Sequence, residues 1–259
     1  MRKQSVTSKT YDSMRVYVLD SNEQVGLEAA NHFTDLILGV LRERDRAAVV
    51  LATGNSQLTF MSALRTKKEI PWGRVLVFHM DAYLGMSDQH SASFSRYIRE
   101  KLVDYVHPAA FYPMIGDAAD ANMEMKRYAE LLRKFPPDIC VLGIGENGHL
   151  AFNDPPADFQ TKETLKLVTL DHECRMQQVH EGHFPTIDDV PRQAITLTVP
   201  ALLSAKHVLA VVPEERKAKA VKAALEGPVT PNCPSSILRT KSNVEMFLDR
   251  ESASLLIQV

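Results

Sequence analysis

Short segments made almost entirely of apolar residues recur along the chain, and longer amphipathic stretches separate them. We predict strands at residues 15–19, 47–52, 75–80, 139–144, 165–170, 195–199, 207–212 and 244–248. Helical spacing of apolar residues predicts helices over residues 22–38, 57–65, 94–105, 123–135 and 217–225. Strands that are apolar on both faces need covering on both faces, and intervening helices favour parallel pairing. The sequence therefore predicts an α/β fold with one mainly parallel, Rossmann-like sheet flanked by helices on both faces.

The 259 residues are long enough for one large domain, and no Gly/Ser linker or internal repeat divides them. We expect a flexible polar leader at residues 1–13 and a single α/β domain over residues 14–259. The leader lacks the apolar region of a signal peptide. No apolar run reaches the roughly 18 residues that a membrane span needs.

Composition excludes several classes of partner. The net charge is −2 and the sequence pI is about 6.5, with no basic block, so nucleic acid and anionic membranes are not expected partners. The three cysteines, Cys140, Cys174 and Cys233, are odd in number and show no CxxC spacing, which argues against a disulfide framework or a structural zinc site. We therefore expect a cytoplasmic protein. The sequence leaves a homo-oligomer open.

A small polar turn between an apolar strand and a helix is the first candidate site segment. It consists of Thr53, Gly54, Asn55 and Ser56. Backbone N–H groups, hydroxyls and the helix N-terminus together favour an anion, and glycine lets a phosphate approach the backbone. The alternative is an ordinary strand–helix turn with a good helix cap. The segment matches neither a Walker loop nor GxGxxG, so it does not specifically indicate a nucleotide.

Asp81 follows the third predicted strand directly, within His79-Met80-Asp81-Ala82-Tyr83. A carboxylate at the mouth of a parallel sheet is placed for proton transfer, because partial burial raises its pKa towards neutrality. The alternative is a loop aspartate that caps the next turn. A metal site at His79 and Asp81 is not indicated, since no further ligand lies at metal spacing.

Three glycines and a histidine follow the strand at residues 139–144. Small residues there let the polar side chains that come next enter a pocket. His149 has an acid five residues later, Asp154, and a polar neighbour, Asn147. A carboxylate beside a histidine sets its tautomer and raises its basicity, as a general acid or base requires. The alternative is a structural histidine.

Three motifs in register resemble the glucosamine-6-phosphate deaminase family, whose sister family is 6-phosphogluconolactonase. They are residues 52–56 (ATGNS), 80–85 (MDAYLG) and 145–155 (GENGHLAFNDP). Further similarity at residues 190–198, 217–218 and 226–227 extends the resemblance over nearly the whole chain beyond the leader. Lactonases usually continue Gly-His with Thr-Ala-Ser-Leu-Phe-Pro and tend to carry Asp-Glu-Arg near Asp81. Both differences favour the deaminases.

The resemblance implies a sugar-phosphate isomerase type of fold and a role for each candidate residue. Asp81 matches the base that moves a proton between C2 and C1, and His149 matches the group that opens the sugar ring. Asn147 and Asp154 match the partners of that histidine, residues 53–56 match the phosphate loop, and Lys217 matches a phosphate-binding lysine; otherwise Lys217 is a solvated residue at a helix start. The implied reaction converts glucosamine 6-phosphate and water to fructose 6-phosphate and ammonia. Proton transfer and phosphate positioning suffice for it, so we expect no metal and no cofactor.

Three positions depart from the family pattern. Asp154 replaces a glutamate, Ala82 replaces a second acid after the base, and Gly182 stands where a phosphate-binding arginine is expected. Either His183 or His180 is then the replacement cation, or the substrate differs from that of the family. Two alternative functions on the same scaffold are a 6-phosphogluconolactonase-type lactone hydrolase and a non-catalytic sugar-phosphate sensor.

Overall fold

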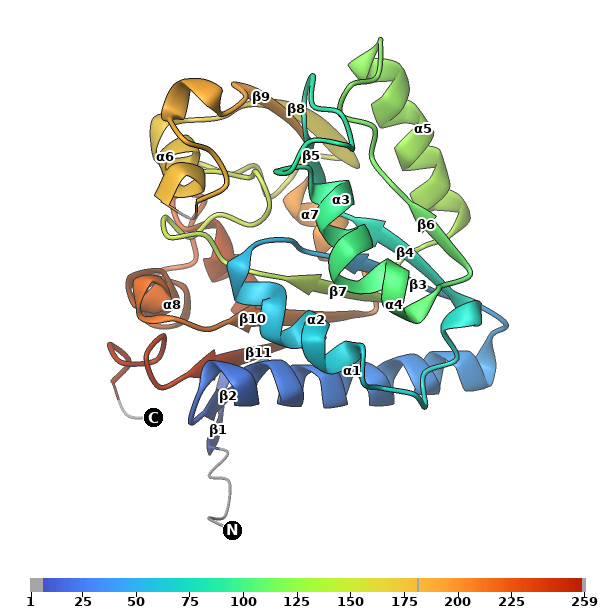
Figure 1. Cartoon of the computed structure of the whole chain (residues 1–259). Coiled ribbons are helices and arrows are strands. Elements are labelled where there is room, and N and C mark those ends of the chain that lie inside the picture. The colour runs from blue at the N-terminus through green and yellow to red at the C-terminus, as the bar shows by residue number, and fades with distance from the viewer. Residues whose placement is uncertain (1–6, 181, 258–259) are drawn as a thin grey trace.

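The computed structural model describes residues 7–180 and 182–257, which form a main sheet of eight strands in the order β1-β2-β11-β10-β7-β3-β4-β6 (Figure 1). In chain order these strands are β1 Thr7–Tyr11, β2 Met14–Leu19, β3 Ala47–Leu51, β4 Val75–His79, β6 Ala110–Tyr112, β7 Ile139–Leu142, β10 His207–Val212 and β11 Val244–Asp249. Every neighbouring pair is parallel except β1 with β2. The predicted mainly parallel sheet is confirmed.

Helices cover both faces of this sheet, as predicted. They are α1 Asn22–Glu43, α2 Leu58–Leu64, α3 Phe94–Ile98, α4 Asp104–Val106, α5 Ala121–Lys134, α6 His172–His180, α7 Val199–Leu202 and α8 Ala218–Glu226. A π-helical turn, Arg99–Val103, joins α3 to α4, so the predicted helix over residues 94–105 is continuous. Short 3-10 turns lie at Asn55–Gln57, Trp72–Arg74, Ile187–Asp189, Glu215–Lys217 and Pro234–Thr240. No helix in the described ranges is both long and apolar enough to span a membrane.

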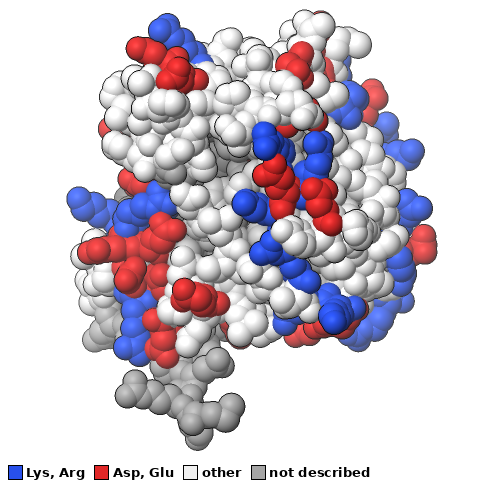
Figure 2. Space-filling model, viewed as in Figure 1, with Lys and Arg blue, Asp and Glu red and all other residues white. Residues whose placement is uncertain are grey.

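Two apolar clusters lie on opposite faces of the sheet because alternate strand residues point to opposite faces. Val49 and Val141 face α1 and α2, whereas Val50 and Cys140 face α5, α7 and α8. Ser21 caps α1 by accepting a hydrogen bond from the backbone N–H of Gln24. Acidic and basic side chains lie close together on the face in Figure 2.

The predicted strands at residues 165–170 and 195–199 do form, but they lie outside the main sheet. β8 Leu165–Thr169 and β9 Gln193–Leu197 pair with β5 Asp81–Tyr83 in a separate antiparallel sheet of order β5-β9-β8. In β8, solvent-exposed residues alternate with less exposed ones, which is typical of an antiparallel sheet with one solvated face. Figure 1 shows this small sheet and α6 at one end of the molecule.

The expectation of a flexible leader over residues 1–13 is wrong for the part that the structure describes. Thr7–Tyr11 form β1, an edge strand that pairs with β2 from Thr7 opposite Val18 to Tyr11 opposite Met14. The first four side chains of β1 are exposed, so backbone hydrogen bonds rather than apolar burial hold the strand against β2. For the same reason, the pattern of hydrophobic residues does not predict this strand. Residues 1–6 lie outside the described ranges.

Gly26 sits where α1 crosses α2 and should tolerate no side chain. A Cβ atom there would lie 2.5 Å from the backbone carbon of Thr59. We expect Gly26→Ala to lower the free energy of unfolding by about 1–3 kcal/mol, because the two helices must separate. Gly39→Ala on the same helix is the matched control, since its Cβ would meet nothing within 4 Å. It should raise stability by about 0.5–1 kcal/mol. Denaturant unfolding measures both, and equal effects would contradict this account of the crossing.

Candidate active site

Four neighbouring strands of the main sheet, β10, β7, β3 and β4, end at one edge, and a cavity opens there. Ligands of open α/β sheets bind at this carboxyl edge. Eight of the ten candidate residues line the cavity: Thr53, Gly54, Asn55, Ser56, Asp81, His149, His183 and Lys217. Asn147 and Asp154 do not line the cavity, but both contact His149, which does. The fold thus brings all ten together.

The turn after β3 has the backbone shape of an anion cradle. Gly54 adopts a φ of +102°, a conformation that side-chain-bearing residues rarely take, and the turn leads directly into a 3-10 turn and α2. Gln57 is fully buried and donates from Nε2 to Ser56 Oγ (3.0 Å) and to the carbonyl of Val211 in β10 (3.1 Å). Tyr97 Oη donates to the Gly54 carbonyl at 2.8 Å. These contacts hold the turn in place before any ligand arrives.

Lys217 brings a cation to the same cavity from the segment after β10. It ends the 3-10 turn that precedes α8, and it is only 4% exposed. Residues 217–225 were predicted as a helix, and Ala218–Glu226 form α8. A lysine this buried is not the solvated surface residue that the alternative interpretation of Lys217 supposed.

Asp81 is a buried carboxyl group in the wall of the cavity. It opens β5, where it pairs with Thr196 of β9, and it is 6% exposed. Its Oδ1 atom has no hydrogen-bond partner among the described residues. Burial raises the pKa of Asp81 to about 7. The side chain therefore does not cap a turn through Oδ1, and it is set to exchange a proton near neutral pH.

His79, two residues earlier, belongs to the core rather than to the cavity. It is fully buried, its Nε2 accepts a hydrogen bond from the Met114 backbone N–H (2.8 Å), and burial lowers its pKa to about 4. A neutral histidine with this contact is structural, consistent with the sequence interpretation that His79 and Asp81 do not bind a metal.

His149 lies in the glycine-rich segment after β7, and Gly145 makes room for its ring. A Cβ atom on residue 145 would fall 2.2 Å from the ring carbon Cε1. The Gly145 N–H donates to the His149 carbonyl at 3.0 Å, and the His149 N–H donates to Asn147 Oδ1 at 3.0 Å. This local network fixes the segment, and only glycine at position 145 is compatible with the observed place of the imidazole.

Asp154 reaches His149 although it is one methylene shorter than the glutamate of the family pattern. Asp154 Oδ1 lies 3.1 Å from His149 Nδ1 and accepts a hydrogen bond from Asn147 Nδ2 at 3.2 Å. The contact between Asp154 Oδ1 and His149 Nδ1 has the distance of an ion pair but not the alignment of a hydrogen bond, so Nδ1 has no hydrogen-bond partner within the described ranges. Burial raises the pKa of Asp154, but His149, Asn147 and Lys166 more than offset this and leave the pKa below its ordinary value. The carboxylate is therefore ionised beside the imidazole.

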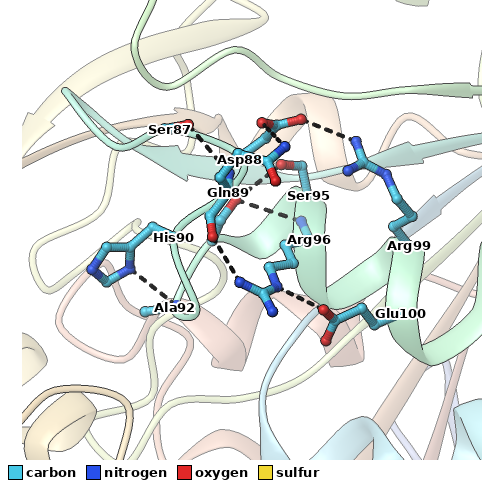
Figure 3. A network of polar contacts seen from close by, with 10 residues as sticks. Ser87, Asp88, Gln89, His90, Ala92, Ser95, Arg96, Arg99 and Glu100 are labelled. Carbon is cyan, nitrogen blue, oxygen red and sulfur yellow. Dashed lines mark hydrogen bonds and ion pairs between the residues drawn. The ribbon is translucent and has the colours of Figure 1, made fainter.

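Several cavity-lining residues were missed by the sequence interpretation. They come from the segment before and within α3 and from α6: Ser91, Ala92, Ser93, Phe94, Tyr97 and Gln178. Figure 3 shows how the first of these segments is held: Arg96 donates to the Gln89 carbonyl (2.7 Å) and pairs with Glu100, and Arg99 pairs with Asp88. The polar run at residues 83–93 and the helix cap at Ser93 were visible signals. Nothing comparable marks α6, whose apolar residues are few.

The two histidines offered as replacements for the missing arginine lie in different places. His183 lines the main cavity with Lys217, whereas His180 lines a neighbouring cavity. Gly182 has a φ of +80° and open space around its Cβ position, which gives the backbone a turn that an arginine would strain. Ala82, in place of the second acid, is 7% exposed and packs in the apolar cluster below the site, where it pairs with Ile195.

Comparison with known proteins places the chain in a family. A family model described as glucosamine-6-phosphate isomerases/6-phosphogluconolactonase matches residues 20–247. The glucosamine-6-phosphate deaminase of Exiguobacterium sibiricum is 36% identical over 217 residues, which cover 84% of each chain. Glucosamine-6-phosphate deaminase 1 of Bacillus subtilis is 31% identical over 248 residues, which cover 93% of this chain and 99% of the relative.

Solved structures agree with this placement. A structure described as a monomeric glucosamine-6-phosphate deaminase is 30% identical, with a TM-score of 0.86 over 93% of this chain and 99% of that one. The 6-phosphogluconolactonase of Thermotoga maritima has a TM-score of 0.74 over 91% of this chain and 99% of that one; at 20% identity it shows the fold alone. The chain belongs to the glucosamine-6-phosphate isomerase/6-phosphogluconolactonase family.

Proposed function

We propose that this chain is a glucosamine-6-phosphate deaminase, which converts glucosamine 6-phosphate and water to fructose 6-phosphate and ammonia. The observation that carries the proposal is Asp81, a buried carboxyl with an unpartnered oxygen and a pKa raised to about 7, in the cavity that also holds His149 and the turn after β3. An isomerisation needs a base of this kind, and phosphate binding alone does not. The names of the relatives at 31–36% identity support the same activity.

The phosphate group binds, in this proposal, at residues 53–56. The start of the 3-10 turn and α2 offers backbone N–H groups to an anion, and Lys217, which is buried in the lining of the same cavity, offers a cation. His183 takes the place of the absent arginine, because it lines this cavity and His180 does not. The far end of the sugar then extends from the turn towards Asp81 and His149.

The chemistry divides between two carboxylates and one imidazole. His149, paired with ionised Asp154, moves the proton from the O1 hydroxyl to the ring oxygen as the C1–O5 bond breaks. Asp81 then removes the proton from C2 and returns it to C1, while a proton passes from the C2 amine to O1, and together these transfers convert the open-chain amino aldose into the imine of the ketose. Water attacks that imine at C2 and releases ammonia. Only proton transfers by these side chains are required, so the proposal includes neither metal nor cofactor.

Two rivals share the scaffold. A lactone hydrolase removes no proton from carbon and has no need of a carboxylate kept out of water in the manner of Asp81. A non-catalytic sensor needs neither Asp81 nor the His149–Asp154 pair. The proposed reaction belongs to amino-sugar breakdown in the cytoplasm. The proposal is compatible with either a monomer or a homo-oligomer.

Ammonia release from glucosamine 6-phosphate tests the proposal directly. We expect stoichiometric ammonia and fructose 6-phosphate from the purified chain. Hydrolysis of 6-phosphogluconolactone without any ammonia would favour the first rival, and binding of both ligands without turnover would favour the sensor.

Asp81→Asn should lower kcat by at least ~10² while the affinity for a non-reactive sugar phosphate stays unchanged, because general acid–base groups contribute that much. Full activity in this variant would remove Asp81 from the mechanism.

Gly145→Ala should impair turnover through His149 alone. The added methyl group would occupy the place of the imidazole, so the ring must turn away from Asp154. We expect kcat to fall by roughly 10²-fold, the cost of a misplaced reacting group. Thermal unfolding should change little, because a side chain rather than backbone moves. Gly73→Ala is the matched control, since its Cβ would meet nothing within 4 Å. Wild-type kcat in Gly145→Ala would show that the place of the His149 ring is not critical.

A further inference from the structure

We propose that His149, Asp154 and Cys174 form a binding site for a thiophilic divalent cation such as Zn²⁺ or Cd²⁺, and that occupation of this site inhibits the enzyme. The site combines the histidine–carboxylate pair of the proposed mechanism with a thiol that the mechanism does not use. The binding does not depend on the proposed function. The inhibition rests on it, because it requires that His149 take part in turnover.

The three side chains already lie almost at the spacing of metal ligands. One ligand atom from each lies within 4.8 Å of the other two, and His149 Nδ1 is 3.1 Å from Asp154 Oδ1. A tetrahedral zinc ion with bonds of about 2.0–2.3 Å sets its ligand atoms roughly 3.3–3.7 Å apart. The sulfur atom therefore needs to approach by about 1.5 Å at most, which a rotation of the cysteine side chain can supply. Imidazole nitrogen, thiolate sulfur and carboxylate oxygen are the three donor types that zinc takes in proteins.

One polar atom of this group has no hydrogen-bond partner among the described residues. His149 Nδ1 is buried and has no hydrogen-bond partner, although an ionised carboxylate lies beside it. Cys174 is 2% exposed and comes from α6. Burial, the negative charges of Asp154, Asp171 and Asp81, and a hydrogen bond to Asp154 raise the pKa of its thiol. A bound cation would neutralise the carboxylate and stabilise the thiolate together.

A second cavity leads to the thiol from outside the main cavity. It is lined by Glu146, Asn147, Glu173, Cys174, Met176 and His180. Among these, Glu173 is exposed to solvent, whereas Glu146 is paired with Arg216 at 3.1 Å. A hydrated cation can therefore reach Cys174 past a carboxylate and an imidazole, without crossing the apolar core.

The positive charge of Lys166 opposes cation binding at this site. Its ammonium group acts on Asp154 and Asp158, and burial lowers its pKa. When the cation binds, the thiol of Cys174 loses its proton to solvent and the cation loses most of its bound water. Cys174, His149 and Asp154 then supply three ligand atoms, and one water remains as the fourth ligand. Once Nδ1 is bound to the metal, the ring can no longer change its protonation with Asp154 as partner. Turnover should stop while the cation stays.

Cadmium titration of the full chain tests the site, since a cadmium–thiolate bond gives an ultraviolet charge-transfer band that oxygen and nitrogen ligands do not. We expect the band to grow to one cadmium per chain. Cys174→Ser should abolish it, and Asp154→Asn, which keeps the thiol, should weaken cadmium affinity at least ~10-fold. Cys140→Ala and Cys233→Ser are the matched controls and should keep the band. Lys166→Gln should tighten binding by removal of the competing charge.

The result that overturns the site is a band that persists in Cys174→Ser, or an affinity that Asp154→Asn leaves unchanged. If Cys174→Ser does not fold, Asp154→Asn decides alone. Inhibition is measured in parallel as ammonia release against cadmium or zinc concentration, with reversal by a chelator. It should follow the occupancy given by the band and disappear in Cys174→Ser. A full band with unaltered turnover would refute the inhibition, whereas a full band in a chain without deaminase activity would refute the proposed function and leave the site standing.

Discussion

Parallel pairing of β10, β7, β3 and β4 decides where every candidate site residue lies. Each strand ends at the same edge, and each is followed by one part of the site: Lys217, the segment with His149, the phosphate turn and Asp81. Val49 of β3 lies opposite Ile139 of β7 and Val77 of β4, and this register sets the relative heights of three of these segments. A slip of one residue would exchange the side chains of a strand between the two apolar clusters, so the close packing of both clusters enforces the register. The site is a consequence of that packing.

Around this edge the molecule departs from the rule that buried polar groups are paired. Asp81 Oδ1 and His149 Nδ1 are both buried without a hydrogen-bond partner, and an unmade hydrogen bond of this kind costs about 1–3 kcal/mol. The cost is offset by the sheet and its two apolar clusters, and by a third cluster under the site that includes Tyr83, Phe152 and Phe184. Unsatisfied groups at a cavity are expected where a ligand completes them. The same condition makes the His149–Asp154 pair open to a cation.

The sequence predicts the main sheet and most of the site because both depend on local signals. Apolar runs mark β2, β3, β4, β7, β10 and β11, and glycine marks the turns at Gly54 and Gly145. It does not predict that β8 and β9 leave the main sheet, because an apolar run carries no record of its partner. The edge strand β1 and helix α6 lack an apolar pattern, so the sequence does not predict them. Because α6 is not predicted, neither is the place of its residues Gln178 and Cys174. That Cys174 lies beside Asp154 is a long-range contact, and no spacing along the chain predicts it.

The central claim is that Asp81 is a base held out of water and ready to titrate near neutrality. Carbon-13 NMR of the chain labelled at aspartate carboxyl carbons measures it directly, with Asp81 assigned by the resonance that Asp81→Asn removes. The account predicts a midpoint near pH 7, with the carboxyl protonated below and ionised above, because burial raises its pKa to about 7. A midpoint near the ordinary aspartate value of about 3.9 would contradict the account, since it would describe a solvated or paired carboxylate.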